Sequence, residues 1–270
     1  MTTAVLETLE CSNADLLHLS EGMQVALQAI RPVNAVNGEV HAYELLVRHA
    51  QEPSTSRILS KFQRCNAMPL LNQALAQTAY QCSNQGASAR SDNEEDPATN
   101  IPPHTVYQFN IPPQGLTSRR RPLHRSLPQL LLELEKDSPH KGLVGVEITE
   151  EPRLTQPQRR ILFQLHEAGI PIFLDDCLTP YRSTTSIRNS LGFLNGVKVG
   201  WEIMQPALGN RDGMYNRLAR QRVQELAGVC ATAGKLFIAE GVNFDRDQSF
   251  LREWGISHYQ HRKETGRIRI

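Results

Sequence analysis

Six short apolar segments of the chain contain, or run directly into, side chains that could bind a metal ion or catalyse a reaction. The segments are 43–46, 106–110, 144–148, 172–176, 197–199 and 236–240. Their polar residues are Glu44, Asn110, Glu147, Asp175, Asp176, Lys198 and Glu240. Carboxylate and amide oxygens suit Mg²⁺ or Mn²⁺ better than zinc, which favours nitrogen and sulfur. A lysine among them could neutralise a phosphoryl group, and a glutamate could take a proton from water.

These segments have the composition of buried parallel strands, because they are rich in β-branched and aromatic residues and are bounded by glycine, proline or polar clusters. In a β/α barrel the reactive residues lie at the carboxyl ends of different strands. We therefore predict one site assembled from six strands at the mouth of a barrel. Any one of these residues alone is more often a loop or capping residue, so the prediction depends on their joint order.

Helical segments alternate with the strands, which predicts an α/β fold, a modified TIM-type (β/α)8 barrel. A strand at 25–30 leads through Asn37-Gly38, a strong hairpin signal, into the strand that contains Glu44. The first strand should therefore be antiparallel to the second. Helices are predicted at 69–82, 130–134, 155–168 and 214–232.

The domain organisation predicted from the chain is simple. Residues 1–22 form an N-terminal extension, and residues 23–270 form a single barrel domain of the usual size, about 250 residues. Within it, the segment 83–104 is polar and poor in apolar residues, which predicts a disordered insertion.

The composition excludes several classes of protein. The 270 residues carry a formal net charge of +1, so no global field would recruit DNA or a membrane surface. The five cysteines are scattered, which argues against a disulfide framework or a structural zinc site and fits a reducing compartment. No apolar run approaches the roughly 20 residues of a membrane span. We predict a soluble, cytoplasmic protein.

Between Met23 and Gln260, the order of eight motifs resembles that of the EAL domain, a bacterial signalling family that binds and often hydrolyses cyclic di-GMP. Each motif alone is weak, whereas eight in the right order are specific. The motifs are Arg31-Pro32-Val33, Glu44-Leu45-Leu46-Val47-Arg48, Phe109-Asn110-Ile111, Glu147-Ile148-Thr149-Glu150, Asp175-Asp176, Val197-Lys198-Val199, Ala239-Glu240-Gly241-Val242 and Gln260.

The resemblance implies a role for each residue. Lys198 and Glu240 would handle the attacking water, Asp176 would reach a second Mg²⁺ or Mn²⁺ ion, and Glu150 would support the loop. The ligands of the first ion would be Glu44, Asn110, Glu147 and Asp175. The residues that contact the substrate would be Arg48, Leu46, Gln260 and Arg31. Hydrolysis of one phosphodiester of cyclic di-GMP would give linear pGpG.

The chain also departs from the family pattern. Leu178 and Pro180 replace glycines, which should remove positive-φ conformations from the loop after the aspartate pair. Gly200 and Asn243 replace acidic residues, and Arg31 replaces a glutamine. Three functions stay open: a slow or conditional phosphodiesterase, a catalytically inactive receptor, and a degenerate interaction module. A homodimer and a regulatory protein partner are compatible with each of them.

Overall fold

The structure is a computed structural model, and it describes residues 23–35, 39–49, 55–64, 67–88, 105–117, 126–148, 154–178, 187–209, 213–261 and 266–269. The predicted N-terminal extension and the Asn37-Gly38 turn lie outside the described residues. They stay predictions.

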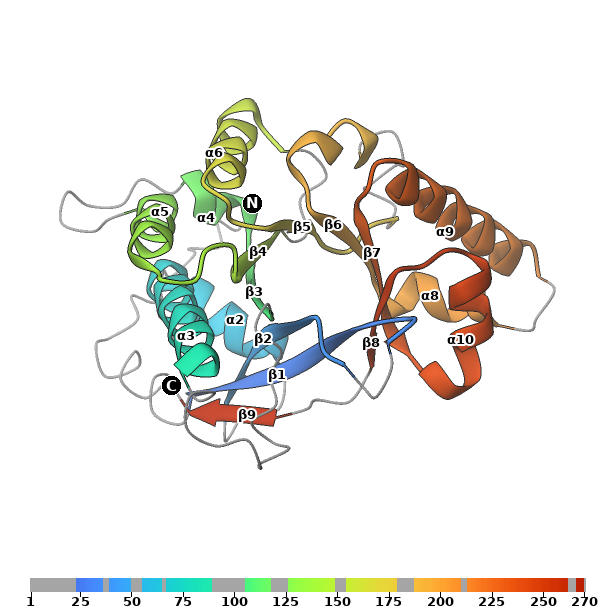
Figure 1. Cartoon of the computed structure of the whole chain (residues 1–270), viewed down its shortest axis with the longest axis horizontal. Helices are drawn as coiled ribbons and strands as arrows, with labels where there is room; N and C mark the ends of the chain where they lie inside the picture. The colour runs from blue at the N-terminus through green and yellow to red at the C-terminus, as the bar shows by residue number, and fades with distance from the viewer. Residues whose placement is uncertain are drawn as a thin grey trace, which may run out of the picture.

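The described strands form one sheet that closes into an eight-stranded barrel with a ninth strand beside it (Figure 1). The strands are β1 (Met23–Pro32), β2 (Ala42–His49), β3 (Val106–Ile111), β4 (Val144–Ile148), β5 (Ile172–Leu174), β6 (Gly196–Val199), β7 (Leu236–Val242), β8 (His258–His261) and β9 (Gly266–Arg269). Strands β2 to β8 run parallel to one another, whereas β1 is antiparallel to both β2 and β8 and closes the ring. The predicted barrel with an antiparallel first strand is confirmed.

Helices surround the ring of strands. They are α2 (Thr55–Arg64), α3 (Met68–Ser88), α4 (Pro113–Thr117), α5 (Leu127–Asp137), α6 (Gln156–Glu167), a 3-10 helix (Leu191–Phe193), α8 (Trp201–Leu208), α9 (Met214–Thr232) and α10 (Phe244–Glu253). Figure 1 shows α3, α5 and α6 along one side of the barrel and α9 and α10 along the other. None of the helices in the described part of the chain is long and apolar enough to cross a membrane.

The predicted helices are present, but one boundary is wrong. Helix α3 continues to Ser88 instead of ending near Cys82, so the first part of the predicted insertion, 83–88, is helical. The remainder, 89–104, lies outside the described residues. Tertiary packing explains the extension, because Cys82 and Ser83 are buried and continue the face of α3 that covers the barrel.

Helix α6 begins and ends where its sequence predicts. Thr155 caps it, and the Thr155 N–H donates to Gln158 Oε1 at 2.8 Å in a capping box. Pro157 lies in the first turn, where its missing N–H has no consequence. Gly169 ends the helix with a φ of 88°, a conformation that favours glycine.

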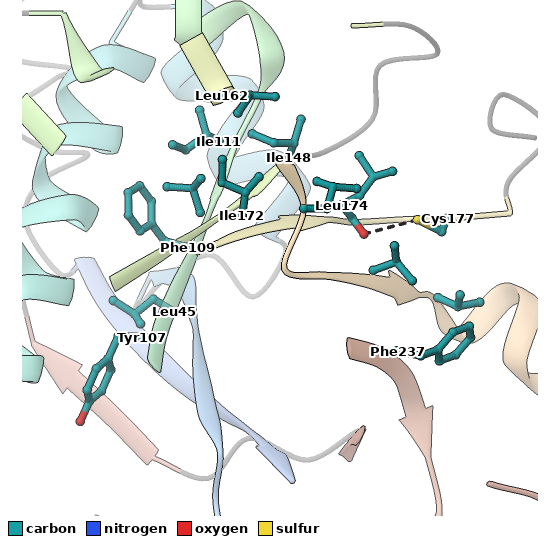
Figure 2. Packing of buried hydrophobic residues seen from close by; sticks show 14 of the residues in the cluster. Leu45, Tyr107, Phe109, Ile111, Ile148, Leu162, Ile172, Leu174, Cys177 and Phe237 are labelled. Carbon is teal, nitrogen blue, oxygen red and sulfur yellow. Dashed lines mark hydrogen bonds between the residues drawn. The ribbon is translucent and has the colours of Figure 1, made fainter. Parts of the chain in front are cut away.

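The outward face of the strands forms the main apolar core. Phe109, Ile148, Leu174 and Phe237 are almost fully buried, and Figure 2 shows Ile148 near Leu162 of α6. Successive strand residues point to opposite faces of the sheet. The polar residues next to these apolar ones therefore point into the barrel, which is how an apolar strand can carry a functional side chain.

The chain beyond β8 differs from the sequence interpretation. Gln260, the last of the eight motifs, lies within β8 and is buried, and the sequence did not predict this strand. After residues 262–265, β9 pairs antiparallel with β1 along the half that β8 does not reach, from Gln24 to Leu27. This strand was not predicted: Arg267, Ile268 and Arg269 alternate, but four residues with one apolar side chain are too short a pattern to indicate a strand.

Candidate functional site

Two layers of polar side chains fill the barrel toward its mouth, the end at which the parallel strands finish. In TIM barrels, each interior layer takes one side chain from every second strand. The first layer comes from β2, β4, β6 and β8, and it consists of Glu44, Glu147, Lys198 and Gln260. The register places a second layer, from β1, β3, β5 and β7, nearer the mouth. It consists of Gln28, Asn110 and Glu240, with Asp175 directly after the end of β5.

Lys198 is the centre of this arrangement. Its side chain is fully buried, and its Nζ donates to Glu44 Oε2 and to Glu147 Oε2, each at 2.8 Å. Nζ also forms an ion pair with Glu240 Oε1 at 2.7 Å. Carboxylates from three strands that are far apart in the sequence therefore converge on one ammonium group. Four of the predicted site residues are thus brought together.

Glu44 orients two neighbouring amides. Asn110 Nδ2 donates to Glu44 Oε1 at 2.7 Å, and Gln260 Nε2 donates to Glu44 Oε2 at 2.6 Å. Their carbonyl oxygens, together with Glu147 Oε1, are buried and accept no hydrogen bond from the described residues. Buried oxygens without a donor are costly, so this part of the barrel interior is suited to a cation.

The cluster contains more carboxylates than cations, and the pKa values reflect this. Burial raises the pKa of Glu147 well above its ordinary value, and the charge of Glu44 adds to the effect. Burial also raises the pKa of Glu240 to about 8, although Lys198 opposes the rise. For Glu44, burial acts upward but is outweighed by Lys198 and by three hydrogen bonds, so its pKa is lowered. Burial tends to lower the pKa of Lys198, yet the surrounding carboxylates raise it well above normal.

The two aspartates follow β5 in a tight turn. The Asp176 N–H donates to Asp175 Oδ1 at 2.8 Å, and the Cys177 N–H donates to the carbonyl of Lys198 at 2.9 Å. Asp176 has a φ of 51° and Leu178 a φ of 68°. The expectation that leucine removes the positive-φ conformation is therefore wrong at Leu178: the backbone is left-handed there, and the buried side chain holds it. Pro180 lies outside the described residues.

Because the backbone at position 178 is left-handed, replacing Leu178 with glycine should destabilise the protein less than replacing it with alanine. Leu178→Ala should lower the free energy of unfolding by about 2–5 kcal/mol, because a fully buried leucine is truncated. Leu178→Gly should cost about 1 kcal/mol less, since glycine has no penalty at positive φ. Urea denaturation of the two variants measures the difference. If alanine is instead the more stable residue, the backbone there is not left-handed.

Gly200 lies between two carboxylates of the site. A Cβ atom at this position would be 3.1 Å from Asp176 Oδ1 and 3.8 Å from Glu240 Oε2. An acidic side chain at position 200 would therefore extend beside Asp176 and Glu240. With glycine there, position 200 contributes no carboxylate beside these two. Asn243, in contrast, is exposed and precedes α10, and its N–H donates to Asp247 Oδ2 at 3.1 Å.

A bulge in β7 fixes the direction of Glu240. The pairing of β7 with β8 shifts register between Glu240 and Val242, which makes Gly241 the extra residue. Gly241 has a φ of 68°, and a Cβ atom there would come within 2.9 Å of the Trp201 side chain. Only glycine satisfies both constraints.

The remaining predicted residues differ in their positions. Leu46 and Arg48 follow Glu44 at alternate positions, so they share its face and lie nearer the mouth. Arg48 Nη1 donates to Thr55 Oγ1 at 2.7 Å. Arg31 is on the opposite face of β1 from Ile30, which lines the barrel, so the structure does not bring Arg31 to the cluster. Glu150 lies outside the described residues.

Two interior residues were missed by the sequence interpretation. Gln28 is in register with Glu44, and its Nε2 donates to the carbonyl of His261 at 2.5 Å. Gln108 is also in register with Glu44 and is fully buried. Residues two apart in a strand lie on the same face of the sheet. Gln28 is two residues before Ile30 and Gln108 is two residues before Asn110, so the strand alternation could have identified both.

No three histidine, cysteine, aspartate or glutamate side chains of the described segments are arranged as a metal site. The position of Lys198 explains this, because its ammonium group lies where Glu44, Glu147 and Glu240 converge. The Lys198 ammonium is therefore the cation that the carboxylates surround in this structure.

Comparison with solved structures supports the fold. The EAL enzyme Bd1971 in its cGMP-bound form has a TM-score of 0.75 at 14% identity, covering 98% of this chain and 68% of that one. The PaMucR phosphodiesterase in complex with c-di-GMP has a TM-score of 0.71 at 18% identity, covering 93% and 96%. Klebsiella pneumoniae BlrP1 with manganese and cyclic di-GMP has a TM-score of 0.63 at 19% identity, covering 89% and 55%.

At these identities the structures establish the fold alone. No curated protein matches the sequence significantly. The family model of the EAL domain, however, matches residues 15–260, which is most of the chain and includes the barrel strands up to Gln260 in β8. This protein therefore belongs to the EAL domain family.

Proposed function

We propose that this protein is a cytoplasmic, metal-dependent cyclic di-GMP phosphodiesterase of the EAL type, slow or conditional, which yields linear pGpG. One observation supports this most strongly: acidic side chains from β2, β4 and β7 converge on the buried Lys198 at a barrel mouth. The similarity to PaMucR, described as a phosphodiesterase in complex with c-di-GMP, favours the same substrate.

The donor set fits a hard divalent cation. Mg²⁺ or Mn²⁺ would be held by Glu44, Asn110, Glu147 and Asp175, whose oxygens are the ligands these ions prefer. Asn110 Oδ1 and Glu147 Oε1 are buried and have no hydrogen-bond donor among the described residues. When bound, the ion would polarise a phosphoryl oxygen and lower the pKa of a water. A manganese complex of BlrP1 is consistent with this choice.

The chain's own residues would carry out the proton and charge steps. Water would attack the phosphorus while the bond to one ribose oxygen breaks; Glu240 would accept a proton of the attacking water, and the departing ribose oxygen would take up a proton from solvent. Burial raises the pKa of Glu240 to about 8, which strengthens it as a base once it is ionised, and the positive charge of Lys198 favours the ionised form. Lys198 orients Glu240 through their ion pair and offsets charge on the phosphoryl group. Arg48 and Leu46 would meet the substrate, and Gln260 would hold Glu44 in place.

The site is weaker where a second ion would bind. Asp176 would reach that ion, but Gly200 beside it supplies no carboxylate. Residues that surround the metal ligands without being ligands themselves typically contribute about 10–100-fold each to metal affinity or activity. This is the observation that favours the second candidate, a receptor that binds the dinucleotide without turnover. A degenerate interaction module is the third.

Raised carboxyl pKa values make cation binding pH-dependent. The pKa of Glu240 is about 8 in the folded, metal-free protein and about 4.5 in an unfolded chain. The stability that this group contributes is thus complete below about pH 4.5 and is lost as the pH rises through about 8. Denaturant melts in chelator should show unfolding free energy falling over this range. Mn²⁺ affinity should rise with pH, because the pKa of the ligand Glu147 is also raised and its proton must leave before the ion binds. A pH-independent affinity would contradict the raised pKa.

A turnover assay in Mn²⁺ tests the proposed function. Conversion of cyclic di-GMP to pGpG, resolved by ion-pair chromatography, is the expected result. Binding without product would favour the receptor. Size-exclusion chromatography with and without the dinucleotide would test a homodimer, and a regulatory protein partner would be sought if purified protein binds but turns over only in extract.

A further inference from the structure

Gln108 has no role in the arrangement described so far. It lies on β3, two residues before Asn110, and the strand alternation places both in the barrel interior. Gln108 is fully buried. Neither its amide nitrogen nor its amide oxygen has a hydrogen-bond partner in the described part of the protein. A buried carboxamide with both ends unpaired is rare, because each end loses its hydrogen bonds to water.

The register places Gln108 directly beneath the carboxylate layer. Its neighbours in the sheet are Glu44 on β2 and Gly145 on β4. Gln108 therefore borders a carboxylate on one side and a residue without a side chain on the other. Neighbouring strands are about 4.8 Å apart, and the Gln108 amide makes no direct hydrogen bond to the described residues, so one bridging water is what could join it to Glu44.

Gln108 belongs to the interior layer directly below the carboxylates, and the other side chains of this lower layer are apolar. A buried apolar cluster lies below Glu44 and Lys198, on the side away from the barrel mouth. It contains Ile30 of β1, Phe173 of β5 and Ile238 of β7. Gln108 is the contribution of β3 to the same layer. An apolar side chain there would complete the cluster without burying an unpaired amide, so packing alone does not explain a glutamine.

We propose that Gln108 is a further positioning residue of the cation site: its amide N–H groups donate, through one bridging water, to the underside of the layer that contains Glu44 and Glu147. Carboxylates that bind metals are usually hydrogen-bonded in turn, and these bonds fix their orientation. Asn110, Gln260 and Lys198 already hold Glu44 from above and from the sides. Gln108 would hold the layer from below. The inference rests on the cation site of the proposed function.

The test compares Mn²⁺ affinity with metal-free stability in the full chain. Gln108→Met keeps the length of the side chain and removes the amide. We expect its dissociation constant for Mn²⁺, measured by electron paramagnetic resonance of the free ion, to rise about 10-fold. Its metal-free melting temperature should change by no more than about 2–4 °C, because the Gln108 amide makes no direct hydrogen bond to the described residues. Gln108→Leu gives the same comparison if the methionine variant does not fold.

Ile238→Val is the matched control, since Ile238 belongs to the same layer but has no polar group. It should lower the melting temperature and leave Mn²⁺ affinity unchanged. A folded Gln108 variant that binds Mn²⁺ as the wild type does would overturn the inference while the cation site stands. Wild-type protein that binds no Mn²⁺ would overturn the cation site itself, and the role of Gln108 with it.

Discussion

Replacing Lys198 with alanine should lower the unfolding free energy of the metal-free protein by about 3–5 kcal/mol, the usual cost of removing one partner from a buried ion pair. Its ammonium group is the shared partner of Glu44, Glu147 and Glu240. Without it, these carboxylates must take up protons or repel one another. Denaturant melts in chelator, at a pH near 8 where the carboxyls tend to ionise, measure the loss.

Mn²⁺ should restore part of this stability, because the cation would replace the lost positive charge. Lys136→Ala is the control, since Lys136 is an exposed lysine of α5 and its replacement should change stability by no more than about 0.5 kcal/mol. If Lys198→Ala is as stable as the control, the three ion pairs do not form in solution.

Replacing Glu44 with glutamine should abolish turnover, with a loss of at least about 100-fold, and should weaken Mn²⁺ binding in parallel. Glutamine keeps the shape of Glu44 but removes its negative charge. It also brings an amide N–H₂ group against donors, because Glu44 accepts from Asn110, Gln260 and Lys198. Loss of a ligand should exceed the roughly 10–100-fold that outer residues typically contribute. Steady-state kinetics and a Mn²⁺ titration measure both effects.

Glu202→Gln is the matched control for this variant, since Glu202 is an exposed acid in the first turn of α8. It should keep wild-type turnover and Mn²⁺ affinity. Circular dichroism must show that Glu44→Gln is folded. A folded Glu44→Gln protein with full turnover would refute the assignment of Glu44 as a ligand.

Much of this fold could be predicted from the sequence. The six strands were visible because each is a short apolar run that contains, or runs directly into, polar residues, and helix α6 because Thr155, Pro157 and Gly169 mark its ends. The cluster around Lys198 followed from the shared rule that barrel strands end at one mouth. The placement of these residues in one cluster agrees with that expectation, and their chemical roles remain proposals.

Other features depend on information that local sequence does not contain. Arg31 was assigned to the site from the Pro32-Val33 pattern beside it, but a shift of one residue reverses the face of a strand, and Arg31 is on the outer face. Gln28 faces the cluster instead. The left-handed backbone at Leu178 is held by burial, which a leucine in a loop does not reveal.

Calorimetric titration with cyclic di-GMP in Ca²⁺ tests the central claim most directly, because Ca²⁺ should occupy the oxygen cage and support little hydrolysis. Micromolar or tighter binding, lost in Glu44→Gln and unchanged in Glu202→Gln, is the expected result. No detectable heat from folded wild-type protein would contradict both the enzyme and the receptor, and would leave the interaction module.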